Sequence, residues 1–142
     1  KIVGCETYWA VFNTQLRRPE ALALPYEHFE LYPEKRATTE GFSKINITHE
    51  KEAIFEKTVY LSDLDIVNHV NNVKYLEWCL DHVVPKRILK QEVKSFEMNF
   101  MKELSLQDNV IIHEGENDNQ TISTFSITKG EKTSFALKLH WK

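Results

Sequence analysis

Apolar and polar residues alternate along most of the second half of the chain, which is the pattern of strands with one buried face. A looser alternation also marks the first dozen residues. The short polar stretches 117–119 and 129–131 separate the last three alternating segments and predict the turns of antiparallel hairpins. The predicted strands cover residues 2–13, 52–60, 92–103, 109–116, 121–129 and 132–141.

One segment has a helical period instead. Its apolar residues recur at spacings of three and four, as Val73, Leu76, Leu80 and Val83. This stripe predicts an amphipathic helix over residues 71–84. Asn71 or Asn72 can cap its first turn, and Pro85 is expected to end it.

The order of these elements is a strand, a loop, one helix and then four strands. A single helix among antiparallel strands predicts an α+β fold, in which a curved antiparallel sheet wraps around the apolar face of one long central helix. Before residue 50 the chain is polar and interrupted by prolines, which is typical of a surface linker. Because the chain opens with Lys1 and a strand-like stretch, we expect it to be a section of a longer protein.

The composition excludes several classes of protein. The 142 residues are 42% hydrophobic, enough for one domain with a core, and Lys and Arg total 18 against 21 Asp and Glu. A net charge of −3 argues against nucleic-acid binding, and no apolar run approaches the roughly 18 residues of a membrane span. The four glycines form no phosphate-binding loop, so no cofactor is predicted. Cys5 and Cys79 form no CxxC pair, which indicates a reduced, cytoplasmic protein.

Polar residues concentrate directly before the predicted helix, in residues 62–69. His69 could act as a base or orient a water molecule, and Asp65 is close enough in sequence to fix its tautomer. The simpler interpretation is that Asp63 and Asn72, and even the whole loop, serve only turns and helix capping. A metal site on Asp63, Asp65 and His69 is disfavoured because no other cluster completes the ligand set, so no metal is predicted.

This same segment resembles a known family. Residues 62–78, SDLDIVNHVNNVKYLEW, resemble the catalytic segment of acyl-acyl carrier protein (acyl-ACP) thioesterases, which are tandem hotdog folds. Tyr8-Trp9 and Arg17-Arg18-Pro19 are similar to the end of the first repeat and its connection to the second. The resemblance therefore implies that residues 1–49 are the end of the first hotdog repeat and the inter-repeat linker. Residues 50–142 would be the second, catalytic repeat.

The resemblance also implies the site residues. The Asp and His of the family's Asp-x-Asn-x-His cluster fall on Asp65 and His69. The family Asn falls on Val67, whose side chain cannot hydrogen-bond, and Asn68 one position later is the expected substitute.

A later Glu of the family falls on Glu103, although a solvated carboxylate at the end of a strand would fit the pattern equally well. Leu104 stands where some members have a cysteine, so no thiol nucleophile is expected there. In the implied reaction Glu103 activates a water molecule, His69 orients it and Asp65 holds His69. Backbone N–H groups of residues 70–72 are expected to stabilise the oxyanion.

The function implied is that of a thioester hydrolase of fatty acid biosynthesis, which releases free fatty acids from acyl-ACP. One alternative is a hotdog thioesterase acting on acyl-CoA, and another is a non-catalytic hotdog module that binds acyl chains, which Val67 favours. The expected partners are the acyl carrier protein and either a second copy or the first hotdog repeat, with no nucleic acid and no membrane. The basic residues of segment 86–94 are either a solvated surface or a docking site for the acidic carrier.

Overall fold

The computed structural model describes two compact units, Lys1–Ser43 and Lys44–Lys142. The described residues are 3–13, 15–16, 18–21, 27–28, 30, 32, 34–39, 41, 43–47, 51–83, 85–115 and 121–142.

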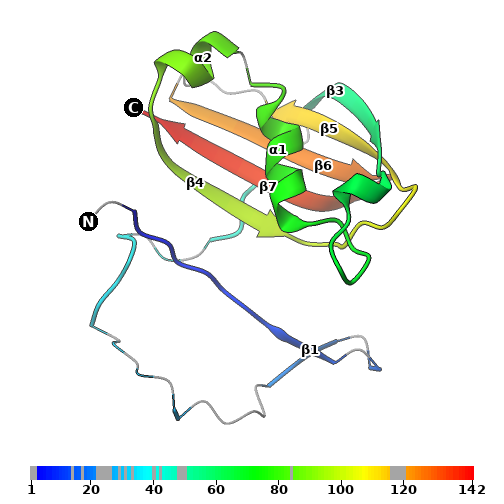
Figure 1. Cartoon of the computed structure of the whole chain (residues 1–142). Helices are drawn as coiled ribbons and strands as arrows, with labels where there is room; N and C mark the ends of the chain where they lie inside the picture. The colour runs from blue at the N-terminus through cyan, green and yellow to red at the C-terminus, as the bar shows by residue number, and fades with distance from the viewer. Residues whose placement is uncertain are drawn as a thin grey trace. The chain divides into compact units, whose positions relative to one another are not determined.

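The second unit is built on a five-stranded antiparallel sheet in the order β3-β5-β6-β7-β4 (Figure 1). The predicted strands of this unit are confirmed, with bounds that differ by a few residues. They are β3 (Lys51–Thr58), β4 (Val93–Phe100), β5 (Asn109–Gly115), β6 (Ile122–Lys129) and β7 (Lys132–Trp141). Gly130, at φ 56°, makes the predicted turn between β6 and β7, whereas the turn expected at 117–119 lies outside the described residues.

The last three strands pair in sequence order, as their predicted turns require, whereas β4 does not pair with the strand that follows it in the chain. β4 pairs with β7 and β3 pairs with β5, so β3 and β4 form the two edges of the sheet. β4 also ends at Phe100, which leaves Glu103 in the connection after the strand.

The predicted helix is shorter than expected. α1 spans Asn72–Leu80, and the Asn71 side chain caps it by accepting the Val73 N–H at 3.0 Å. Pro85 does not end this helix but begins a second one, α2 (Pro85–Lys90). A proline suits the first position of a helix because its fixed φ is already helical and its missing N–H would have no helical partner there.

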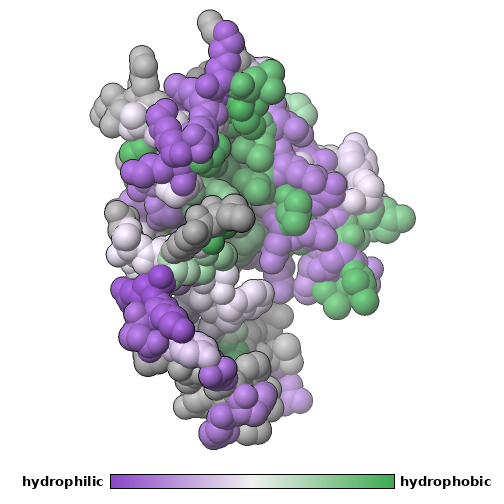
Figure 2. Space-filling view, turned by 60° about the vertical axis from the view of Figure 1, so that its left-hand side comes forward, coloured by the Kyte–Doolittle hydropathy of each residue, from purple (hydrophilic) through white to green (hydrophobic). Residues whose placement is uncertain are grey.

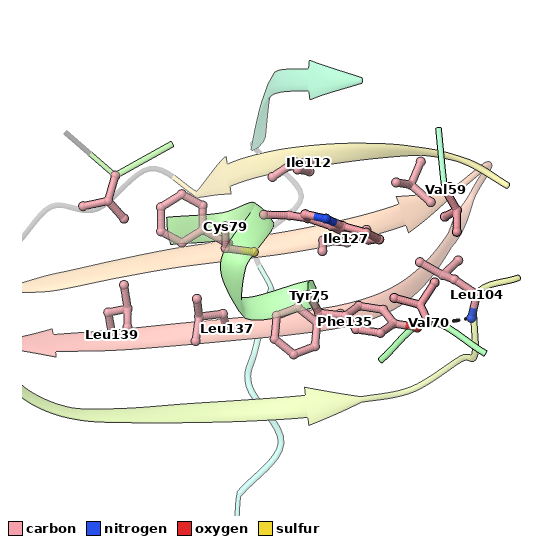
Figure 3. Packing of buried hydrophobic residues seen from close by; sticks show 14 of the residues in the cluster. Val59, Val70, Tyr75, Cys79, Leu104, Ile112, Ile127, Phe135, Leu137 and Leu139 are labelled. Atoms are coloured by element: carbon pink, nitrogen blue, oxygen red, sulfur yellow. Dashed lines mark hydrogen bonds between the residues drawn. The ribbon is translucent and has the colours of Figure 1, made fainter. Parts of the chain in front are cut away.

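The buried face of α1 also differs from the predicted stripe. Tyr75, Trp78 and Cys79 are buried, whereas Val73 is 57% exposed. α1 lies across one face of the sheet, over β6 and β7, and the strands curve around it (Figure 1). Figure 3 shows the resulting core, in which the Tyr75 ring lies 5.3 Å from that of Phe135.

The chain that precedes β3 is fastened to the sheet within the same unit. The backbone N–H of Ile45 donates to Oδ1 of Asn99 at 2.7 Å, and both residues are buried. Asn99 lies between Met98 and Phe100 on β4, so its side chain points to the sheet face opposite theirs.

The first unit contains a small two-stranded ladder, β1 (Val11–Asn13) with β2 (Arg18–Glu20). Of the strand predicted over residues 2–13, the structure describes residues 3–13, and of these only the last three form a strand. β2 lies where irregular chain was expected. Alternation marks a strand only where a neighbouring strand completes the ladder, and this ladder is three residues long.

Candidate active site

The loop between β3 and α1 is organised by the buried carboxylate of Asp63. This residue ends a short 3-10 helix, Leu61–Asp63. Its Oδ2 accepts the backbone N–H of Tyr60 at 2.9 Å and lies 3.3 Å from Nζ of Lys57. Its carbonyl oxygen accepts the N–H of Asn71 at 2.9 Å. Asp63 thus ties the beginning of the loop to its end.

Asp65 shapes the tip of the same loop. Its Oδ1 accepts the backbone N–H of Val67 at 2.9 Å and that of His69 at 3.2 Å. Its own N–H donates to the His69 carbonyl at 2.8 Å. We expected Asp65 to hold the imidazole of His69. Among the described residues this carboxylate makes no hydrogen bond to the His69 ring, and it holds the His69 backbone instead.

Asn68 has a conformational reason to be in this loop. Its φ is 64°, in the left-handed region, which asparagine tolerates better than most residues. Its backbone N–H donates to the Asp65 carbonyl at 3.1 Å, and its side chain is exposed.

His69 and Glu103 meet, although they come from segments far apart in the sequence. His69 Nε2 lies 3.6 Å from Glu103 Oε2, and their side chains are 43% and 71% exposed. This separation is too long for a direct hydrogen bond. It allows one water molecule to contact both atoms, which is the arrangement needed to activate water.

A buried backbone contact brings this pair together. The residue after His69, Val70, donates its N–H to the carbonyl of Leu104, the residue after Glu103, at 2.9 Å. Leu104 is fully buried, and its own N–H donates to the Tyr75 hydroxyl at 3.2 Å (dashed line in Figure 3). Burial raises the pKa of Tyr75, and the Leu104 hydrogen bond opposes that shift in part.

Two of the three backbone donors expected for an oxyanion are already used. The N–H of Val70 donates to Leu104, and that of Asn71 donates to Asp63. Of the three, Asn72 keeps an N–H that no described residue accepts. Of the three predicted donors, Val70 and Asn71 are therefore ruled out, and the role of Asn72, the first residue of α1, stays a prediction.

A protein-family model matches the part of the chain that carries this site. It describes the C-terminal domain of acyl-ACP thioesterases and matches residues 48–142. The chain belongs to the acyl-ACP thioesterase family.

Three named proteins are similar to this chain. The chloroplastic oleoyl-acyl carrier protein thioesterase 2 of Arabidopsis thaliana is 32% identical over 75 residues, which is 51% of this chain and 20% of the Arabidopsis protein. An acyl-ACP thioesterase from Bacteroides thetaiotaomicron has a TM-score of 0.75 at 22% identity over 92% of this chain. The 12:0-ACP thioesterase from Umbellularia californica gives 0.72 at 19% identity, again over 92% of this chain.

These structures confirm the predicted hotdog fold. The chain spans 53% and 52% of the two solved thioesterases and only 20% of the Arabidopsis protein. The similarity thus concerns about half of each solved structure.

Cysteine chemistry has no place beside Glu103 in this acyl-ACP thioesterase domain. Leu104 occupies the neighbouring position and is fully buried. Cys79 lies in the core, where burial raises its pKa to about 12, so it stays a thiol at neutral pH.

Among the described residues no group of three or more His, Cys, Asp or Glu side chains is arranged to hold a metal ion. None of the helices described is long and apolar enough to cross a membrane.

Two residues of the domain hold the backbone near the site. Asp63 accepts the Tyr60 N–H at the start of the 3-10 helix, which agrees with the capping role expected of it. Tyr75, which no sequence pattern singles out, accepts the Leu104 N–H beside Glu103.

Arg87 has contacts within the domain that the sequence did not predict. It belongs to the segment interpreted as either a solvated surface or a docking site, but it donates to Ser123 Oγ at 3.1 Å, and its guanidinium lies 4.7 Å from the centre of the Trp141 ring.

Proposed function

We propose that this chain carries the catalytic site of a thioester hydrolase that releases free fatty acids from acyl-ACP. The observation that carries the proposal is the 3.6 Å approach of His69 Nε2 to Glu103 Oε2 within a domain of this family. Two relatives are named for acyl carrier protein substrates, oleoyl in one and 12:0 in the other.

In the proposed reaction the Glu103 carboxylate takes a proton from the water molecule that it shares with His69. The water oxygen forms a bond to the thioester carbonyl carbon, and the carbonyl electrons move to its oxygen. The Asn72 N–H, at the positive end of α1, is the available donor for that oxyanion. When the tetrahedral intermediate collapses, the C–S bond breaks, and the proton held by Glu103 passes to the leaving sulfur.

The alternatives differ in the carrier of the acyl group and are separated by kinetics. Thiol release is measured on one fatty acyl chain attached either to acyl carrier protein or to coenzyme A. We expect kcat/KM to be at least about 10-fold higher for the carrier protein, which corresponds to about 1.4 kcal/mol of extra transition-state binding. Equal values, or a preference for coenzyme A, would favour the acyl-CoA thioesterase alternative.

Asn68 is proposed to supply the amide that Val67 lacks, and two substitutions separate this role from its left-handed backbone. Asn68→Gly keeps the backbone conformation and removes the amide. We expect it to lower kcat about 10-fold with unchanged stability, whereas Asn68→Ala also costs about 1 kcal/mol of stability. Denaturant unfolding and steady-state kinetics measure the two effects. A glycine variant with normal kcat would show that Asn68 serves the turn alone.

Exposed aromatic residues on β4 support a second proposal, that another hotdog unit packs beside this one. On β4, an edge strand, Phe96 is 52% exposed and Phe100 45%, which is unusual for aromatic residues in a sheet. Figure 2 shows hydrophobic side chains reaching the surface among hydrophilic ones on the face that it draws. We propose that β4 pairs with the first repeat of a tandem enzyme or, in the isolated chain, with a second copy. Residues 1–49 would then be the end of that first repeat and the linker, and 50–142 the second repeat.

Light scattering of the isolated chain at micromolar concentration tests the pairing. We expect a homodimer that Phe96→Lys converts to a folded monomer, since the charge would face the partner. Phe55→Lys on the opposite edge, where Phe55 is 48% exposed, is the matched control and should leave the dimer intact. A strictly monomeric unaltered chain would contradict this arrangement.

The compartment is proposed from the cysteines. Cys5 and Cys79 are both free thiols, which supports the proposal of a cytoplasmic protein. The Arabidopsis relative is named as chloroplastic.

A further inference from the structure

The Tyr75 hydroxyl contacts the backbone next to Glu103 from inside the core. The residue is 3% exposed, and its ring is held by Phe135 and, edge-on at 5.6 Å, by Phe100. At the end of that ring the hydroxyl oxygen accepts the N–H of Leu104 at 3.2 Å. A core aromatic residue thus fixes a backbone amide of the connection between β4 and β5.

Leu104 is held from two directions. Its carbonyl accepts the Val70 N–H, and its N–H donates to Tyr75. Since His69 precedes Val70 and Glu103 precedes Leu104, these two bonds set the distance between the backbones that carry the reacting pair. Leu104 and Val70 are 0% and 3% exposed, so water has little access to replace either bond.

The Glu103 side chain depends on this backbone for its position. It is 71% exposed, and among the described residues its one polar contact is the 3.6 Å approach to His69. On its other side the Lys102 N–H donates to the Ser134 carbonyl at 3.2 Å. The segment is therefore anchored before and after Glu103, and the anchor after it is the Tyr75 hydroxyl.

We propose that Tyr75 is a positioning residue, which acts through the Leu104 amide to hold the Glu103 carboxylate at its working distance from His69. This inference rests on the proposed function of Glu103. Phenylalanine at this position would keep the ring packing but leave the buried Leu104 N–H without an acceptor. The connection would then shift, and misplacement of a catalytic group by about 1 Å lowers rates by up to about 100-fold.

The first test is independent of activity. Amide hydrogen exchange followed by NMR should show the Leu104 N–H exchanging at least about 10-fold faster in Tyr75→Phe than in the unaltered protein. Phe125→Leu serves as the control, because Phe125 is 2% exposed in the same core but lies on β6, opposite Glu114 and Leu137. Unchanged Leu104 exchange in Tyr75→Phe would overturn the proposal.

The second test is a double-mutant cycle with Glu103→Gln. We expect Tyr75→Phe alone to lower kcat about 10-fold with KM changed less than about two-fold, and to add less than about two-fold in the Glu103→Gln background. A tyrosine that served only stability would lower both backgrounds by the same factor, and that result would overturn the proposal. If Glu103→Gln itself keeps full kcat, the proposed function fails, while the exchange result still reports on the Leu104 contact.

Discussion

Replacing His69 or Glu103 by alanine is expected to lower kcat by about 100-fold or more, in line with the usual contribution of general acid–base groups. In the proposed mechanism Glu103→Ala removes the base that takes the proton from water, and His69→Ala removes the group that orients the same water molecule. Steady-state release of free thiol from a fatty acyl-ACP measures both effects.

The two residues are also expected to act as a unit. Because both are proposed to act on one water molecule, the double variant should be no more than a few-fold slower than the slower single variant. His82→Ala and Glu77→Ala are controls of the same residue types: His82 stacks on Phe55, and Glu77 pairs with Lys74 on the helix surface. A Glu103→Ala variant with near-normal kcat would place the base elsewhere.

Replacing Asp63 by alanine is expected to cost about 3 kcal/mol of folding free energy, since breaking a buried ion pair leaves its partner uncompensated. The Asp63 and Lys57 side chains are 8% and 18% exposed, and the Lys57 ammonium also lies 4.8 Å from the centre of the Trp78 ring. The substitution leaves the Lys57 ammonium without its carboxylate partner and the Tyr60 N–H without its acceptor. Urea unfolding measures the change in free energy.

Asp63→Asn makes this prediction more specific. The amide oxygen still accepts from Tyr60 but carries no charge, so the loss should be smaller than for alanine. A change below about 0.5 kcal/mol for Asp63→Ala would show that the pair with Lys57 behaves like an exposed salt bridge.

The sequence predicts the elements of this fold better than their partners. Alternation identifies β4 as a strand, but it does not say which strand lies beside it, and the pairing with β7 depends on where the chain turns after Leu104. Pro85 shows a similar limit, because a proline suits the region after one helix and the start of the next equally well. In the structure Pro85 is the first residue of α2.

The buried face of α1 was missed for a different reason. A pattern of aliphatic residues selects Val73, whereas burial follows the large rings of Tyr75 and Trp78, which pack against the sheet. Tyr and Trp carry a polar group on a large apolar ring, so a pattern made of aliphatic residues leaves them out.

The site residues also differ in how well the sequence predicts them. Asp65 and His69 stand out because polar residues cluster before a helix, but Glu103 could be proposed only from the family resemblance. What joins Glu103 to His69 is the Val70–Leu104 hydrogen bond, a long-range contact without a local sequence signal. The same bond uses the Val70 N–H, which the sequence predicts as a donor to the oxyanion.

The most direct measurement of the central claim is the product analysis of one fatty acyl-ACP incubated with the unaltered protein and with Glu103→Gln. We expect the unaltered protein to release free thiol and free fatty acid in equal amounts over many turnovers, and the Glu103→Gln variant to do so about 100-fold more slowly. Binding of the acyl-ACP without release of either product, by a protein that is folded, would identify a non-catalytic acyl-binding module and contradict the account.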